Sequence, residues 1–263
     1  MRMRLFAIAA FGAAGVALLA VTAFRAKPLE ASCGKELVAK GPRCMPKSDA
    51  PPRAVDARVH VPEATVSVGS SDWEAEGRVA PRIVRAGPFE VDAFEATEGA
   101  VRCPSCIYPS PTFDAQDAQR AASGLTRDEA RVFCKQRGGR LPTEDEWIVV
   151  AAGPKSQRYP WGDTGAVCRR AAFGLASGPC ARGATGPDTV GAHPLGDSAL
   201  GVHDLAGNVA EWVEAKEPVV RGGSWATSLA TELRTWSREV VAEDARDPRI
   251  GFRCVYDGPG GKP

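Results

Sequence analysis

Eight cysteines behind an apolar N-terminal run constrain this chain more than any other feature of its sequence. Leu5 to Phe24 carries no charged side chain over twenty residues, and arginines or lysines flank it on both sides. This pattern is typical of an export signal or a single membrane anchor. Because disulfides form mainly outside the reducing cytosol, cysteines in an exported chain predict a cross-linked fold. We therefore expect an exported protein, periplasmic or extracellular, with residues 1–25 either cleaved as a signal peptide or kept as a membrane tether.

The spacing of six cysteines favours local disulfides. The pairs close in sequence are Cys33 with Cys44, Cys103 with Cys106, and Cys168 with Cys180. The first and third pairs enclose ten and eleven residues, loops that close easily. The Cys-Pro-Ser-Cys run could instead hold a metal or act as a redox pair. A structural pair is favoured, because the chain has no second CxxC for a zinc site and the following residues do not start a helix.

Composition and charge limit the classes of partner. The chain is 263 residues long, with 44% apolar residues, 25% charged residues and a net charge of +1. It has no block of lysines and arginines, so a nucleic-acid partner is not expected. Residues 26–58, rich in proline and lysine, indicate a linker that carries the Cys33–Cys44 loop. Residues 59–263 are expected to form one domain.

Two helices and several short strands are predicted within this domain. Thr126 and Thr143 are each followed three residues later by glutamate, a capping box that predicts a helix after each. Alternating apolar residues predict strands over 66–70, over 83–94 with a break at Gly-Pro, and over 250–256. Gly153 to Pro194 is rich in glycine and proline and without periodicity, which predicts a long irregular region that Cys168 and Cys180 could pin.

Five ordered motifs resemble one family. They are Gly139 to Trp147, Tyr159 to Asp163, Gly207 to Trp212, Arg221 to Trp225, and Gly251 to Cys254. In order and spacing they are similar to the formylglycine-generating enzyme, or sulfatase-modifying factor, family over roughly Val59 to Tyr256. The resemblance implies an α+β fold, an irregular variant of the C-type-lectin fold with little regular secondary structure and several disulfides. It also implies a disulfide between Cys134 and Cys254.

The resemblance identifies where an oxidase of this family would hold copper. Two cysteines follow the Gly-Gly-Ser turn in the oxidases, and their thiolates bind the metal. The corresponding residues here are Thr227 and Glu232. Cu(I) prefers soft thiolates, so copper is not expected. Ser224 keeps its family position, and without a metal beside it we expect it to shape the turn.

Calcium is the cofactor that the resemblance favours. The family's calcium loop corresponds to Asp204, Gly207, Val209 and Glu211, with two side-chain and two backbone oxygens. The alternative is an Asx turn at Asp204 and a surface ion pair at Glu211. A second calcium site of the family uses an asparagine where this chain has Ala172, which argues against that site.

Two functions remain open from the sequence. The first is an exported, calcium-stabilised binding or accessory module for an unidentified protein, peptide or glycan, without oxidase activity. The alternative is an enzyme of protein or peptide maturation that uses another residue set, including a non-haem iron site from His193, His203 and Asp204. The sequence contains no Gly-x-Ser-x-Gly motif, so a serine hydrolase is not indicated.

Overall fold

The computed structural model of the protein describes residues 37–40, 43–46, 57–68, 80–102 and 115–258. Cys33, Cys103 and Cys106 lie outside these ranges, as does the apolar run at residues 5–24. The described residues include no helix that is both long and apolar enough to span a bilayer. The cleaved-signal and retained-anchor alternatives therefore both remain predictions.

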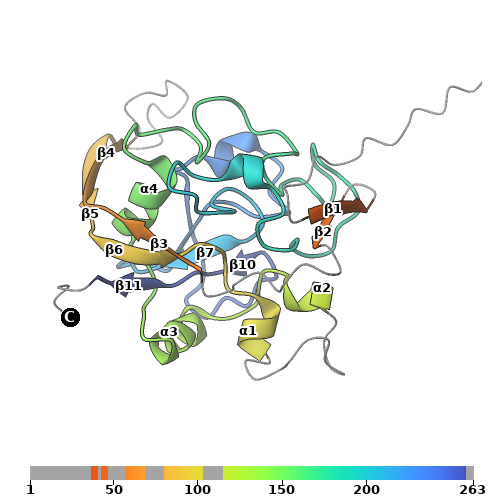
Figure 1. Ribbon diagram of the computed structural model, residues 1–263, viewed down its shortest axis with the longest axis horizontal. Helices are drawn as coiled ribbons and strands as arrows, with labels where there is room; N and C mark the ends of the chain where they lie inside the picture. Colours follow the sequence, from red (N-terminus) through yellow and green to blue (C-terminus); the bar gives the residue numbers. More distant parts are fainter. Residues whose placement is uncertain (1–36, 41–42, 47–56, 69–79, 103–114, 259–263) are drawn as a thin grey trace, which may run out of the picture.

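Short strands and short helices make up the regular structure (Figure 1). The strands are β1 (Leu37–Lys40), β2 (Arg43–Pro46), β3 (Arg58–Val61), β4 (Ala64–Val68), β5 (Arg82–Ala86), β6 (Phe89–Asp92), β7 (Ala210–Val213), β8 (Val219–Arg221), β9 (Arg238–Val240), β10 (Ile250–Gly251) and β11 (Val255–Asp257). The helices are α1 (Glu98–Arg102), α2 (Ala115–Ala118), α3 (Arg127–Gln136) and α4 (Glu144–Ala152), with 3₁₀ turns η2 (Pro194–Gly196) and η3 (Ala230–Leu233).

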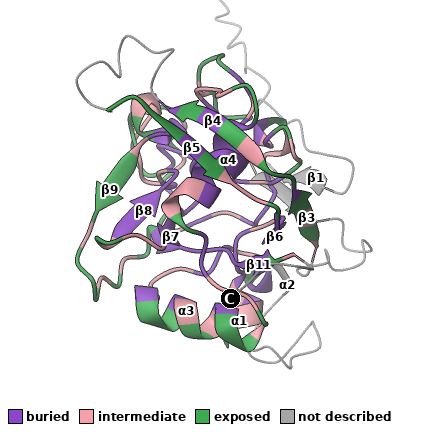
Figure 2. Cartoon of the chain, turned by 90° about the vertical axis from the view of Figure 1, so that its left-hand side faces the viewer, coloured by how far each residue is buried: buried purple, intermediate pink, exposed green. Residues whose placement is uncertain are grey.

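Two small sheets organise the centre of the domain. One has the order β10-β7-β8-β9, and the other has the order β11-β6-β3. β4 pairs with β5, and β1 pairs with β2 within the segment expected to be a linker. In the larger sheet β7 and β8 are fully buried, whereas all three residues of β9 are exposed (Figure 2). β9 is therefore the solvent-facing edge of this sheet.

The two capped helices are confirmed. The side chains of Thr126 and Thr143 each accept a hydrogen bond from the backbone N–H of the glutamate three residues later. The side chain of that glutamate accepts one from the backbone N–H of the threonine. The helices differ in burial. Only three residues of α3 are buried, but seven of the nine residues of α4 are, and α4 contacts β4 and β5 in the core.

The prediction of one strand over residues 250–256 is wrong. Ile250 and Gly251 pair in parallel with β7, whereas Val255 to Asp257 pair antiparallel with β6 in the other sheet. Between them the chain leaves the first sheet and enters the second, and Phe252 to Cys254 are buried at the crossing. An apolar pattern cannot show this change of sheet, because residues 250–256 are all buried on both sides of the crossing.

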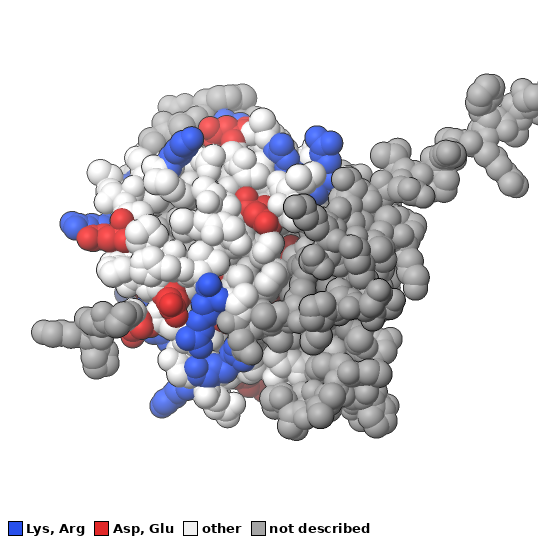
Figure 3. All heavy atoms as spheres, viewed as in Figure 1, with Lys and Arg blue, Asp and Glu red and all other residues white. Residues whose placement is uncertain are grey.

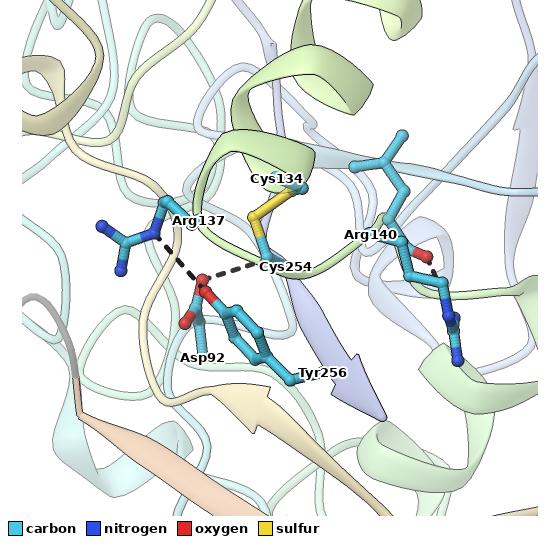
Figure 4. Close-up of a disulfide and its surroundings, with 7 residues drawn as sticks. Asp92, Cys134, Arg137, Arg140, Cys254 and Tyr256 are labelled. Atoms are coloured by element: carbon cyan, nitrogen blue, oxygen red, sulfur yellow. Dashed lines mark hydrogen bonds between the residues drawn. A yellow bond between two sulfur atoms is a disulfide. The ribbon is translucent and has the colours of Figure 1, made fainter. Parts of the chain in front are cut away.

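A disulfide anchors this crossing to α3. Cys134 and Cys254 are both fully buried and are joined, as the family resemblance implied. Figure 4 shows the surroundings of the bond, where the Cys254 N–H donates to Asp92 and Arg137 donates to the Tyr256 hydroxyl. Burial raises the pKa of the Asp92 carboxyl, which lies next to the disulfide on the β6 side. The bond therefore ties the last strand to the first long helix.

The expected irregular region is confirmed over residues 153–193, which contain turns and isolated bridges only. A disulfide joins Cys168 and Cys180 inside it. Polar contacts hold the rest. The Asp188 carboxylate pairs with Arg182 and lies 3.5 Å from His193 Nε2. The backbone N–H of Asp188 donates to the Asn208 side-chain oxygen at 2.8 Å.

We expect the two disulfides to contribute unequally to stability. In the chain-entropy model the Cys134–Cys254 bond, with a separation of 120 residues, contributes about 5 kcal/mol and the Cys168–Cys180 bond, with 12, about 3 kcal/mol. Urea unfolding of the Cys134→Ala/Cys254→Ala and Cys168→Ala/Cys180→Ala variants should show this order. Equal losses would mean that loop length does not set the contribution.

Asp188 should make stability depend on pH. Burial alone would raise its pKa, but His193 and Arg182 outweigh burial and lower the pKa to about 2, against an ordinary value of 3.8. A lowered folded-state pKa stabilises the protein above pH 4, and this contribution is lost as the pH falls toward 2. Asp188→Asn should cost about 2 kcal/mol at pH 6 and about half of that at pH 3, measured by denaturant unfolding. The exposed Asp244→Asn is the control, and a pH-independent cost for Asp188→Asn would contradict the assignment.

Candidate functional site

The chain after β8 opens onto a pocket of about 500 Å³. Its uncharged walls come from Ala210, Val220, Gly222, Gly223, Ala226 and Leu229, and its hydroxyls from Thr227, Ser228 and Ser237. Its charged side chains are Arg221, Glu232, Arg238, Glu239 and Arg249. The pocket therefore forms where β8, the turn after it, η3, β9 and the start of β10 meet.

Two glycines give the turn its shape. Gly222 and Gly223 have φ angles of 94° and 68°, in the left-handed region that favours glycine. A Cβ on Gly223 would lie 2.7 Å from Leu233 Cδ2, too close for two carbon atoms. The Gly-Gly pair is therefore required both by the backbone angles and by the packing against η3.

The two expected copper positions meet at this turn. A Cβ on Gly223 would lie 3.2 Å from Thr227 Oγ1 and 3.3 Å from the Glu232 carbonyl oxygen, and both residues line the pocket. The structure therefore brings Thr227 and Glu232 to one wall of the pocket, where they supply a hydroxyl and a carboxylate.

Ser224 shapes the turn, as expected. It is buried, its N–H donates to Thr227 Oγ1 at 2.9 Å, and its Oγ accepts from the Ala226 N–H at 3.3 Å. The Thr227 N–H closes the turn by donating to the Ser224 carbonyl oxygen at 3.0 Å. Both hydroxyls thus take part in holding the backbone.

Three arginines at the pocket have partners outside its lining. Arg221 is buried and donates to Glu144, and Arg238 donates to Glu144 at 3.0 Å and to Glu217 at 3.1 Å. Burial opposes ionisation of Glu144, but these two guanidinium groups hold its pKa below the ordinary value. Arg249 pairs with Asp247. The positive charges of the pocket are therefore already compensated by neighbouring carboxylates.

The expected calcium loop lies deep in the core. Glu211 is fully buried, and both of its carboxylate oxygens accept hydrogen bonds from Arg253, at 2.6 and 2.8 Å. The Trp147 indole donates to the same carboxylate at 2.9 Å. The alternative of a surface ion pair at Glu211 is wrong, because its pairing with Arg253 is buried.

The other predicted calcium ligands also have neighbours within the protein. The Asp204 carboxylate accepts from the Gly191 N–H. Gly207 packs against the carbonyl of Ala172, which also accepts from the Asn208 N–H at 2.8 Å. The two predicted side-chain ligands, Asp204 and Glu211, are therefore both bound to protein groups.

One arginine faces three buried carboxylates here. Glu95, Asp204 and Glu211 surround Arg253, and burial together with its two acidic neighbours raises the pKa of Glu95 well above its ordinary value. Burial also raises the pKa of Asp204. Glu95, which sequence reasoning missed, accepts from the Asn208 side chain and from the Val209 N–H. The only sign of Glu95 in the sequence is a charged residue directly after the strand predicted over 83–94.

The two histidines considered for an iron site each have another carboxylate as their near partner. His203 stacks on Phe94 with ring centroids 4.3 Å apart, and its Nδ1 lies 2.7 Å from Asp197. His193 lies beside Asp188. Both imidazoles act electrostatically on the buried Asp204 carboxylate, but their ion-pair contacts are with Asp197 and Asp188.

Removing Arg253 should destabilise the protein strongly. Arg253→Met leaves three buried carboxylates without their cation, for which we expect a loss of about 3 to 5 kcal/mol in denaturant unfolding. Arg246→Met, which breaks an exposed pair with Glu129, should have no measurable effect. If calcium rather than Arg253 compensates Glu211, chelation by EGTA would lower the melting temperature of the wild type. We expect no such change.

Comparison with known proteins supports one family. A family model described as "Sulfatase-modifying factor enzyme 1-like domain" matches residues 45–258, beginning within the segment expected to be a linker. Inactive C-alpha-formylglycine-generating enzyme 2 of Bos taurus is 33% identical over 145 residues, which cover 49% of this chain and 47% of that protein. Hercynine oxygenase of Mycolicibacterium thermoresistibile is 30% identical over 167 residues, covering 51% of this chain and 35% of that protein. The chain thus spans about half or less of these relatives.

A solved structure shows the same fold. PvdO from Pseudomonas aeruginosa superimposes with a TM-score of 0.62 at 18% identity, over 87% of this chain and 98% of that one. The mixed, sparse helices and strands and the disulfides agree with the expected α+β, C-type-lectin-like fold. Because the family model covers most of the chain and the fold agrees, the chain belongs to the sulfatase-modifying factor family.

Proposed function

We propose that this chain is an exported binding or accessory domain that lacks formylglycine-generating oxidase activity. The observation that carries the proposal is the pocket wall at Gly223, which Thr227 and Glu232 line, and the family resemblance assigns the two copper positions to these residues. A hydroxyl and a carboxylate are hard ligands that do not replace a pair of thiolates for Cu(I). The pocket keeps the geometry of an active site and has lost the groups that bind the metal.

The pocket favours a protein or peptide ligand over a glycan. Sugar recognition commonly stacks an aromatic ring against the sugar, and no aromatic side chain lines the pocket. Trp147, Trp212, Trp225 and Trp236 are all buried, as expected for rings that fill an irregular core. Backbone, hydroxyls and paired charges instead offer the hydrogen-bonding groups that a peptide requires.

Export is part of the proposal. Its support is the apolar run at residues 5–24 and the two disulfides of the described residues, since such bonds persist in oxidising compartments. Cys134, Cys168, Cys180 and Cys254 are all bound in disulfides. The domain therefore has no described thiol nucleophile with which to carry out the chemistry of the oxidases.

An enzyme with a different residue set is the second candidate. Its support is the 30% identity to a hercynine oxygenase. Against it, His193 and His203 lie beside different carboxylates. Iron in stoichiometric amount in protein purified from the exported fraction would favour this candidate.

Copper binding should be absent and should return when sulfur is restored. In competition with the Cu(I) chelator bathocuproine disulfonate, we expect the wild type to take up no copper. Thr227→Cys/Glu232→Cys should take up about one equivalent, because the Gly223 turn already brings the two positions together. Each single variant is the control and should bind far more weakly. Tight Cu(I) binding by the wild type, with oxidation of a cysteine peptide, would overturn the proposed function.

A further inference from the structure

Glu232 differs from the other charged side chains of the pocket. Its carboxylate is exposed, and it forms no hydrogen bond or ion pair with any residue in the described part of the chain. By contrast, the three lining arginines are paired with Glu144, Glu217 and Asp247, none of which lines the pocket. The charge left uncompensated at the Gly223 wall is therefore negative.

Glu239 adds to this negative charge. It lies on β9, lines the pocket and is exposed. It interacts electrostatically with Arg249, but the guanidinium of Arg249 is already bound to Asp247. An entering ligand thus meets two lining carboxylates and three guanidinium groups that each already bind a carboxylate.

The walls suit a long side chain with a charged end. Val220, Ala226 and Leu229 provide apolar surface beside Glu232. Lysine and arginine bury their aliphatic stems along such surfaces and place the charged group against a carboxylate. A small inorganic cation would leave these apolar contacts unused.

The rim indicates that the cation belongs to a protein segment. β9 pairs only with β8 among the described strands, so its other edge presents unpaired backbone groups. Leu229, which lines the pocket, is 59% exposed, and Val240 on β9 is 53% exposed. An extended segment lying along β9 would pair its backbone with this edge and cover both residues.

We propose that the pocket receives the arginine or lysine side chain of an extended protein segment, and that Glu232 is the residue that selects it. This inference rests on the proposed binding function. In this view Glu232 exchanges the metal-binding role of its family position for recognition of a cation. On the face shown in Figure 3, charges of both signs lie interspersed.

The test uses two peptides that differ in one group. The probe is Ac-Ser-Val-Ser-Arg-Ser-Val-Ser-amide, and its neutral counterpart carries citrulline in place of arginine. Each is titrated into ¹⁵N-labelled wild-type protein, and the amide signals of Gly222 and Gly223 are followed. We expect saturable shifts with the arginine peptide and at least tenfold weaker binding of the citrulline peptide. N-acetyl-arginine methylamide, whose two amide groups are too few to form a strand along β9, should also bind at least tenfold more weakly.

Glu232→Gln keeps the shape of the side chain and removes its charge, so it should weaken binding of the arginine peptide at least tenfold. Because Glu232 is exposed and unpaired, we expect an unchanged melting temperature. Asp244→Asn makes the same change in net charge outside the pocket and should change binding less than twofold. Equal binding of the two peptides, full binding by Glu232→Gln, or no shift at Gly222 and Gly223 at 5 mM peptide would each overturn the inference.

The two proposals can fail separately. If neither peptide binds and the wild type still takes up no Cu(I), the pocket does not select a cation while the loss of the oxidase site stands. If the wild type binds Cu(I) and oxidises a cysteine peptide, both proposals fail. Tight binding of the free methylamide would show that the ligand is a small cation, and the protein-segment inference would be wrong.

Discussion

The buried ion pair between Arg253 and Glu211 holds together parts of the chain that are far apart in sequence. Besides Glu211 on β7, Arg253 donates to the backbone carbonyls of Asp92, Ala93 and His203. Glu211 in turn accepts from Trp147 on α4. A fold with so little regular secondary structure has many backbone groups that no helix or sheet can satisfy. A guanidinium with five donors satisfies several of them at one point.

The position of the pocket follows from this central contact. Glu211 fixes β7, β7 pairs with β8, and β8 leads directly into the Gly222–Gly223 turn. Trp147 also packs against this turn, since a Cβ on Gly222 would lie 3.2 Å from its ring. Four of the five motifs that resemble one family are therefore one physical unit. Trp147 of α4 and Arg253 both donate to Glu211 of β7, and Trp147 also lies against the Gly222 turn.

Local signals in the sequence predicted local structure well. The hydroxyl and glutamate of each capping box lie within one helical turn, so Thr126 and Thr143 located both long helices. The lack of periodicity in residues 153–193 likewise reported a real lack of helices and strands. Features that depend on distant partners were missed. The partner of Glu211 lies 42 residues away, the change of sheet after Gly251 depends on β6, and the charged groups of β9 enter the pocket only through pairing with β8. The family motifs, not the residue pattern, located Thr227 and Glu232.

The geometry at Gly223 explains how the frame of the site can outlast its chemistry. The left-handed turn is set by Leu233 packing and by the hydrogen bonds among Ser224, Ala226 and Thr227, none of which needs a metal. Thr227, which the family resemblance assigns to the first copper position, itself takes part in the turn, because its hydroxyl accepts the Ser224 N–H. At the second position Glu232 is exposed, so a charged side chain there carries little desolvation cost. Two substitutions could thus remove a copper site without disturbing the fold that built it, and the pocket would remain available to a different ligand.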